Sequence, residues 1–187
     1  RSADRIFVST PAWLPRIERW KRTEHPIRWL PIPSSLPVSV DPLQVERIRR
    51  SVAPSRQLIG HFGTFRQSIA QMLQSLVPPL LRNNPDRAVL FVGRGGQNFA
   101  EALVNNCPQL RGQVIATGGV APQEAADHLA ACDLLLQPYA DGATSRRSSL
   151  MAGLALGKPI ITTTGALSEP FWRESGAEAF APADAPE

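Results

Sequence analysis

The chain has 187 residues, a net charge of +4 and a hydrophobic fraction of 43%, which supplies a globular core and excludes a disordered chain. No apolar run approaches the roughly 18–20 residues that a membrane span requires. The two cysteines, Cys107 and Cys132, fit neither a zinc site nor a secreted disulfide framework, so a reducing cytosol is expected. Residues 1–56 hold 11 of the 20 basic residues and 5 of the 16 acidic ones, so only this part is basic. The length fits one domain and a piece of another, and we expect both ends to be cuts in a longer chain.

The N-terminal part is predicted to be a small strand and helix region that leads into a linker. Its pattern indicates a strand over 5–9, a helix over 13–22 and a short apolar piece over 27–32. Four prolines between positions 31 and 42 then indicate a linker, because proline fixes φ and cannot donate to a sheet. A short helix over 43–50 leads out of this stretch.

From Gln57 onward, apolar runs of strand length alternate with longer segments of helical period. The expected strands are 58–62, 88–92, 113–117, 134–138 and 159–163, and the expected helices are 67–82, 97–106, 122–131 and 146–156. This alternation predicts an α/β fold whose parallel sheet is covered on both faces. The strands are almost wholly apolar, as two buried faces require. In such sheets, ligands bind outside the carboxyl ends of the strands.

The segment 138–159 breaks a local rule of helix chemistry. Thr144 or Ser145 is expected to cap the helix, which places Arg146 and Arg147 in its first turn. Two cations are unfavourable there, because a helix N-terminus already carries a partial positive charge.

A phosphate group would relieve this conflict by meeting both guanidinium groups and the free N–H groups of the helix. The nearby polar side chains are Ser145, Ser148 and Ser149, and the nearby acid is Asp141. The alternative is a solvated arginine pair whose stems lie on apolar surface.

Two glycine-containing turns are further candidates for phosphate contact. Residues 60–66 follow the first regular strand and include Gly63, Thr64 and Arg66, and Arg94 lies in a similar turn after the next strand. Neither turn matches a P-loop or a dinucleotide fingerprint, which disfavours a nicotinamide-dependent oxidoreductase. Each turn could also be only a turn, and His61 could contact a ligand or be structural.

From position 58 to 183 the chain resembles the C-terminal domain of GT-B glycosyltransferases of the family-4-like type, the glycosyl transferases group 1. The resemblance rests on landmarks in order, which are 60–65, 90–93, 117–120, 131–138 and 153–162. It implies a Rossmann-like doubly wound parallel sheet, the C-terminal half of a GT-B fold, with a remnant of the N-terminal domain. The implied division is 1–35 for the end of the N-terminal acceptor domain, 36–56 for the linker and 57–187 for a nucleotide-sugar-binding domain truncated at its C-terminus.

The resemblance also implies where a donor substrate would bind. Gly63 and Thr64 would approach the diphosphate, and the backbone from Gly118 to Val120 would meet the base. The full expected substrate-binding set is Gly63, Thr64, Arg66, Arg94, Gly118, Val120, Asp141, Ser145, Arg146, Arg147 and Ser149. Asp141 is the candidate catalytic residue, and neither a metal nor a cofactor beyond the nucleotide diphosphate sugar is expected.

One departure from the family pattern concerns two glutamates that usually flank the start of the last helix. Their positions are occupied here by Thr144 and Ala152. Asp141 is the nearby carboxylate that could take part of their role. Glu169 lies where the family often has a glutamate close to the donor, or it is a surface residue.

The resemblance implies a retaining hexosyl- or glycosyltransferase that moves a sugar to a glycan or lipid-linked acceptor, in bacterial polysaccharide biosynthesis. This half alone is expected to be inactive, because the acceptor face is missing. The alternative is a non-catalytic nucleotide-binding or assembly module. Trp13, Trp20 and Trp29 lie among basic residues and would contact a membrane surface, an acceptor or a missing domain. The expected location is cytoplasmic, with the inner face of the membrane as an option, and nucleic acid is not an expected partner.

Overall fold

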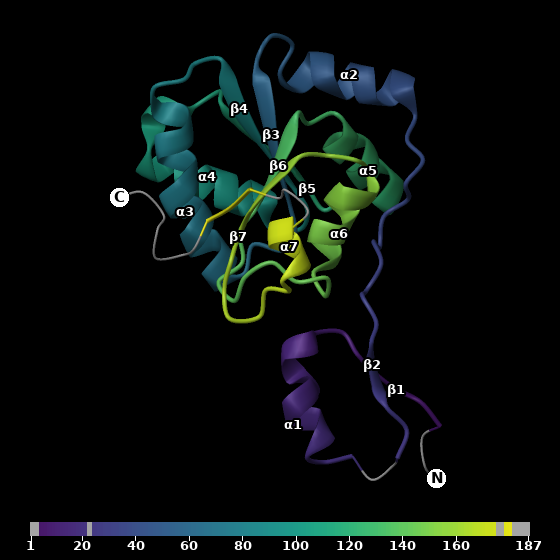
Figure 1. Cartoon of the computed structure of the whole chain (residues 1–187). Helices are drawn as coiled ribbons and strands as arrows, with labels where there is room; N and C mark the ends of the chain where they lie inside the picture. The colour runs from purple at the N-terminus through teal and green to yellow at the C-terminus, as the bar shows by residue number, and fades with distance from the viewer. Residues whose placement is uncertain (1–3, 22–23, 175–177, 181–187) are drawn as a thin grey trace.

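The computed structural model describes residues 4–21, 24–174 and 178–180 (Figure 1). A large α/β part begins at residue 42, and a smaller N-terminal segment lies beside one end of it, connected by an extended stretch of chain. None of the described helices combines the length and apolarity needed to cross a membrane.

The large part is built on a sheet of six parallel strands in the order β5-β4-β3-β6-β7-β8. The strands are β3 (Gln57–Phe62), β4 (Arg87–Val92), β5 (Val114–Gly118), β6 (Leu134–Gln137), β7 (Ile160–Thr163) and β8 (Glu178–Phe180). The chain builds outward from β3 to β5, returns to the other side of β3 with β6, and then builds outward in the opposite direction. This is the expected doubly wound parallel sheet, with β8 as a sixth strand that the sequence pattern did not predict.

Helices cover both faces of this sheet. They are α2 (Pro42–Val52), α3 (Gln67–Arg82), α4 (Gly96–Asn106), α5 (Pro122–Ala130), α6 (Ser148–Ala155) and α7 (Phe171–Glu174), with a 3-10 turn η2 over Pro108–Leu110. In Figure 1, α3 and α4 lie on one side of the sheet and α5 and α6 on the other. The expected helix over 67–82 agrees with α3 residue for residue.

Alternate residues of the strands from β3 to β7 enter two separate cores, which explains their largely apolar sequences. In β4, Val89 and Phe91 join the cluster formed with α3 and α4. Leu90 and Val92 join the cluster formed with α5 and α6. Each core therefore lies between the sheet and one helical layer, and neither core covers the carboxyl ends of the strands.

The N-terminal segment pairs β1 (Ile6–Val8) with β2 (Ile27–Trp29) in parallel. Between them lie a 3-10 turn, η1 (Pro11–Trp13), and α1 (Leu14–Glu18). The helix is shorter than the expected 13–22. From the end of β2 an extended stretch runs along α5, where Gln123 Nε2 donates to Ser39 O at 2.9 Å.

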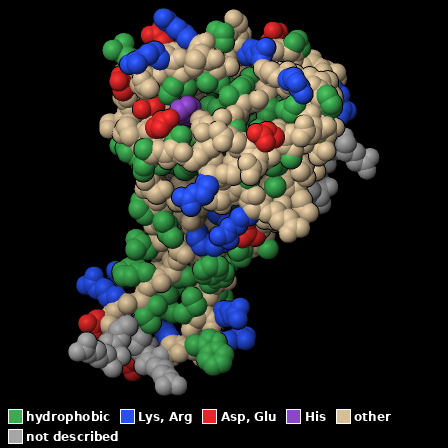
Figure 2. All heavy atoms as spheres, turned by 180° about the vertical axis from the view of Figure 1, so that it is seen from behind, with side chains coloured by type: hydrophobic (Ala, Val, Ile, Leu, Met, Phe, Trp, Pro, Cys, Tyr) green, Lys and Arg blue, Asp and Glu red, His purple; other side chains and the backbone are tan. Residues whose placement is uncertain are grey.

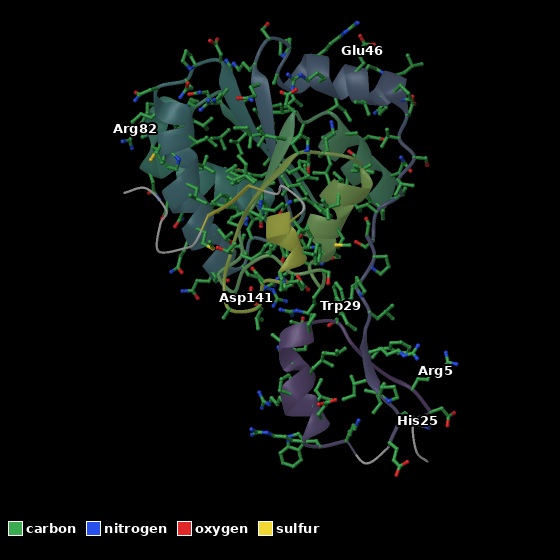
Figure 3. All side chains as sticks on the ribbon, in the orientation of Figure 1. Arg5, His25, Trp29, Glu46, Arg82 and Asp141 are labelled. Carbon is green, nitrogen blue, oxygen red and sulfur yellow. The ribbon has the colours of Figure 1, made fainter. Side chains whose placement is uncertain are left out.

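The surface where the two parts meet is rich in charge. Figure 2 shows basic side chains gathered at this junction, with hydrophobic side chains around them on the N-terminal segment. In Figure 3, Asp141 and Trp29 lie at the junction, whereas Arg82 and Glu46 lie on remote sides of the large part.

Candidate functional site

A cavity of about 660 Å³ opens at the carboxyl ends of β3 and β6. These two strands are neighbours in the sheet, and the chain leaves them toward opposite sheet edges. They therefore form the topological switch point, where open α/β sheets hold their ligands. Of the residues expected to bind substrate, the cavity is lined by Gly63, Thr64, Arg66, Asp141, Arg146, Arg147 and Ser149.

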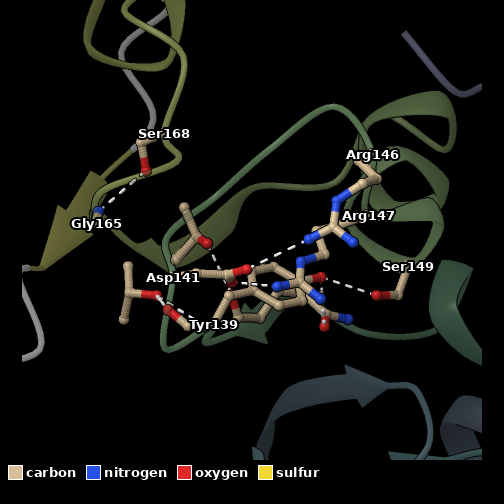
Figure 4. Close-up of polar contacts among 10 residues, drawn as sticks. Tyr139, Asp141, Arg146, Arg147, Ser149, Gly165 and Ser168 are labelled. Atoms are coloured by element: carbon tan, nitrogen blue, oxygen red, sulfur yellow. Dashed lines mark hydrogen bonds and ion pairs between the residues drawn. The ribbon is translucent and has the colours of Figure 1, made fainter. Parts of the chain in front are cut away.

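Asp141 lies between the two arginines of the cavity. Its Oδ2 is 3.3 Å from Arg146 Nη2, and its Oδ1 accepts a hydrogen bond from Arg147 Nη2 (Figure 4). The group carries two positive charges and one negative charge, and Arg66 adds a further cation at the cavity wall. A site with this balance attracts an anion and fixes its orientation.

The sequence pattern indicated that both arginines lie in the first turn of the helix, and the structure shows that they precede it. Helix α6 begins at Ser148, and Arg147 precedes it with an extended backbone of φ −82° and ψ 95°. Neither Thr144 nor Ser145 caps the helix. The reason is a turn before it, closed by a hydrogen bond from Arg147 N to Thr144 O at 2.9 Å. The conflict between the arginines and the helix is thus relieved in two ways: Asp141 pairs with both arginines, and the helix begins two residues later than expected.

Glu169 is buried and holds this turn through Ser145. The alternative interpretation of Glu169 as a surface residue is therefore wrong. The Glu169 carboxylate accepts from Ser145 N at 3.0 and 3.1 Å, from Ser145 Oγ at 2.8 Å and from Trp172 Nε1 at 2.5 Å. The Ser145 hydroxyl therefore points into the protein rather than into the cavity. Ser145 is thus not among the residues that line the cavity, because a tertiary partner 24 residues further along the chain takes its hydrogen bond, and its expected contact with substrate stays a prediction.

Tyr139 is a cavity residue that the sequence reasoning missed. Arg147 Cζ lies 4.9 Å from the centre of its ring, and its hydroxyl is 2.8 Å from Ser149 Oγ. Burial raises the pKa of Tyr139 to about 12, so the phenol stays neutral. The available signal was its position as the only tyrosine in the chain, two residues after the end of β6.

His61 lies at the end of β3 and lines the cavity, although its side chain is almost fully buried. Nδ1 is 2.8 Å from the carbonyl oxygen of Leu136, which can only accept, so this nitrogen carries the proton. Burial lowers the pKa of His61 to about 4 and keeps the ring neutral. The ring packs edge-on against Phe65 and Phe91, with ring centroids 5.3 and 6.4 Å away. These contacts support the structural interpretation.

Arg94, Gly118 and Val120 do not line this cavity. Arg94 follows β4, Gly118 is the last residue of β5 and Val120 comes two residues later, on the other side of a platform of glycine-containing turns. Gly93 N donates to Gly118 O at 3.1 Å, and a Cβ added to Gly93 would lie 2.3 Å from Gly63 O. Any ligand that reached both Gly63 and Gly118 would have to extend across this platform.

The described part of the chain contains no group of three or more His, Cys, Asp and Glu side chains placed to hold a metal ion. The charged side chains that line the cavity are three arginines and one aspartate, a set suited to a multiply charged anion.

The family model for glycosyl transferases group 1 matches residues 56–187. Among curated proteins, no sequence matches the chain.

Several solved structures share the fold at low sequence identity. HepE from Anabaena, solved in complex with UDP and glucose, is similar with a TM-score of 0.68 and 18% identity over 98% of this chain and 51% of that chain. WaaG, a glycosyltransferase involved in lipopolysaccharide biosynthesis, gives 0.67 and 22% over 94% of this chain and 49% of that chain. Sucrose-phosphate synthase from Thermosynechococcus elongatus gives 0.66 and 20% over 98% and 47%. The chain thus spans about half the length of these structures.

Proposed function

We propose, from the premise that this chain belongs to the glycosyl transferases group 1 family, that its cavity binds a nucleoside diphosphate sugar for transfer to a glycan or lipid-linked acceptor. The observation that carries the proposal is the position of the arginine group. Arg66, Arg146 and Arg147 line one cavity at the switch point of the sheet, where the fold holds its ligands.

The chemistry of sugar transfer explains why cations belong at this place. When the bond between the anomeric carbon and the diphosphate breaks, negative charge builds up on the leaving phosphate oxygens. Arg146, Arg147 and the free N–H groups at the start of α6 would stabilise that charge. Asp141 would hold both guanidinium groups in place, and it remains the candidate catalytic carboxylate. Retention of anomeric configuration and a reaction without a metal are parts of the same proposal, and the family resemblance is their support.

The nature of the base and the cellular setting are also proposals. UDP is the first nucleoside diphosphate to test, because HepE was solved with UDP and glucose. A bacterial cytoplasmic role in polysaccharide assembly is supported by the similarity to WaaG, which acts in lipopolysaccharide biosynthesis. Contact with the inner face of a membrane is supported by Phe7, Trp20 and Leu30, which are exposed on the basic N-terminal segment. Failure to sediment with anionic vesicles would refute the membrane contact.

Calorimetric titration with UDP, GDP and ADP, and with NAD as the control ligand, tests the proposed site. We expect one nucleoside diphosphate to bind, and Arg146→Ala or Arg147→Ala to weaken it about ten- to a hundred-fold, the loss expected for a charged hydrogen bond. Arg82→Ala is the matched control, since Arg82 is exposed at the end of α3, remote from the cavity. A folded protein that bound none of the three nucleotides would overturn the proposal.

A non-catalytic nucleotide-binding or assembly module is the second candidate. The observation that favours it is that Thr144 and Ala152, at the positions of the family's glutamate pair, are both fully buried. Neither side chain can reach a substrate. Turnover decides between the two candidates. If the domain is a non-catalytic module, the full-length protein would bind a nucleotide sugar but would release no nucleoside diphosphate in the presence of any acceptor.

A further inference from the structure

The N-terminal segment contacts the arginine turn of the cavity directly. Ile32 N donates to Ser145 O at 3.1 Å, and Trp29 lies 5.8 Å from Phe171 between ring centroids. The third contact is Trp13, whose ring lies under the Arg146 guanidinium, with Cζ 5.1 Å from the ring centroid. All three contacts come from residues outside the sheet that forms the cavity.

Arg146 depends on such contacts for its orientation. Its side chain is partly exposed and would have many rotamers if it were held at one point only. Its ion pair with Asp141 is 3.3 Å long and is shared with Arg147, which makes a closer contact with the same carboxylate. A partly exposed pair of this kind contributes little by itself. A flat aromatic surface on the other side of the guanidinium adds cation–π attraction and excludes alternative rotamers.

We infer that Trp13 is a positioning residue for the anion site: it holds Arg146 in the cavity, so that the N-terminal segment sets the affinity for a diphosphate. The inference rests on the proposed function, since it takes the cavity to be a diphosphate site. Trp13 is not itself part of the cavity lining, and it acts only through Arg146, which is. By linkage, a bound diphosphate also favours the docked position of the N-terminal segment.

The test compares Trp13→Ala, Trp13→Phe and Trp20→Ala in the 187-residue chain. Trp20 is the matched control, because it lies on the same segment and is 79% exposed. Trp13 is 36% exposed and belongs to none of the buried core clusters, so its replacement should leave the fold intact. The first readout is calorimetric affinity for UDP and for inorganic pyrophosphate, a probe that does not depend on the base. The second is the rate at which phenylglyoxal modifies Arg146, followed by peptide mass mapping without ligand.

We expect Trp13→Ala to weaken both probes about two- to five-fold, the range of a partly exposed cation–π contact, and to speed the modification of Arg146. Trp13→Phe should keep most of the affinity and most of the protection of Arg146, and Trp20→Ala should change neither quantity. If Trp13→Ala matches Trp20→Ala in both readouts, the inference is wrong. If the unchanged protein binds neither probe, the proposed function fails, and the modification rate alone then decides whether Trp13 positions Arg146.

Discussion

At the scale of single residues, His61 is a histidine whose burial disfavours the charged, doubly protonated ring. Its pKa is lowered from 6.5 to about 4, mainly by burial. The unfolded chain therefore binds a proton more readily than the folded chain as the pH falls below 6.5. This difference makes no contribution above that pH and reduces the free energy of unfolding by about 3 kcal/mol between pH 6.5 and 4.

Replacing His61 with asparagine removes the titration and keeps a donor for the Leu136 carbonyl. We expect His61→Asn to be less stable at pH 7, because the ring contacts with Phe65 and Phe91 are lost. Its loss of stability between pH 7 and 4.5 should nevertheless be smaller than that of the unchanged protein. Urea unfolding at the two pH values measures both quantities, and equal pH dependence in the two proteins would show that His61 is not the responsible group.

The sequence predicted the arginines of the site but not what holds them. Arg146, Arg147 and Asp141 are close in the chain, and the clash of two cations with a helix start pointed to them before the fold was known. Glu169 lies 24 residues beyond Ser145, and its contact with that residue exists only after β7 and its following loop have folded onto the sheet. Local chemistry could therefore identify the charged group but not its buried support.

At the scale of elements, the glycine turn after β4 packs against the turn after β3 that lines the cavity. Gly93 has φ +127°, and a Cβ there would lie 2.3 Å from Gly63 O, which is backbone and cannot swing aside. Gly157 follows α6 with φ +65° and has no atom within 4 Å of an added Cβ. The two positions share a positive φ but differ in crowding.

We expect Gly157→Ala to lower the free energy of unfolding by about 1–2 kcal/mol, the cost of a left-handed residue with a side chain. Gly93→Ala should cost more than this, because the clash adds to the unfavourable φ. It should also weaken diphosphate binding by shifting Gly63, whereas Gly157→Ala should not. Chemical denaturation and calorimetry of the two variants test this, and equal stability losses would mean that the turns are not tightly packed.

Element boundaries could be predicted where both faces of a strand are buried and became less accurate where tertiary contacts compete. The five regular strands lie within one residue of their expected limits, because long apolar runs permit few alternatives. Helix α6 starts two residues later than expected, since Asp141 and Glu169 hold the residues before it. β8 is three residues long, and its sequence Glu-Ala-Phe has no apolar run that could have indicated a strand.

At the scale of the whole molecule, strand order decides which loops form the site. No periodicity in the sequence states that β6 pairs with β3, and the family resemblance supplied the doubly wound arrangement. That pairing brings the turn at 60–66 to the segment 138–149 and places the turn of Gly118 and Val120 two strands away. The expected site residues consequently divide into a cavity group and a remote group.

The large part should fold without the N-terminal segment. Within the described ranges, the buried residues of the three core clusters all lie between Ala53 and Trp172, and the earliest residue packed against them is Leu36. A chain that lacks residues 1–33 would lose only a few surface contacts, each worth about 0.5–1.5 kcal/mol. We expect its thermal unfolding to remain cooperative and its free energy of unfolding to fall by no more than about 3 kcal/mol.

The same truncation separates the stability of the large part from the quality of its anion site. Without Trp13, Arg146 loses its aromatic support, so pyrophosphate should bind about two- to five-fold more weakly even though the sheet is intact. Circular dichroism and calorimetry on one preparation measure both effects. A truncated chain that failed to fold would show that the N-terminal segment is part of the core. A folded chain with unchanged affinity would show that Arg146 is held by Asp141 alone.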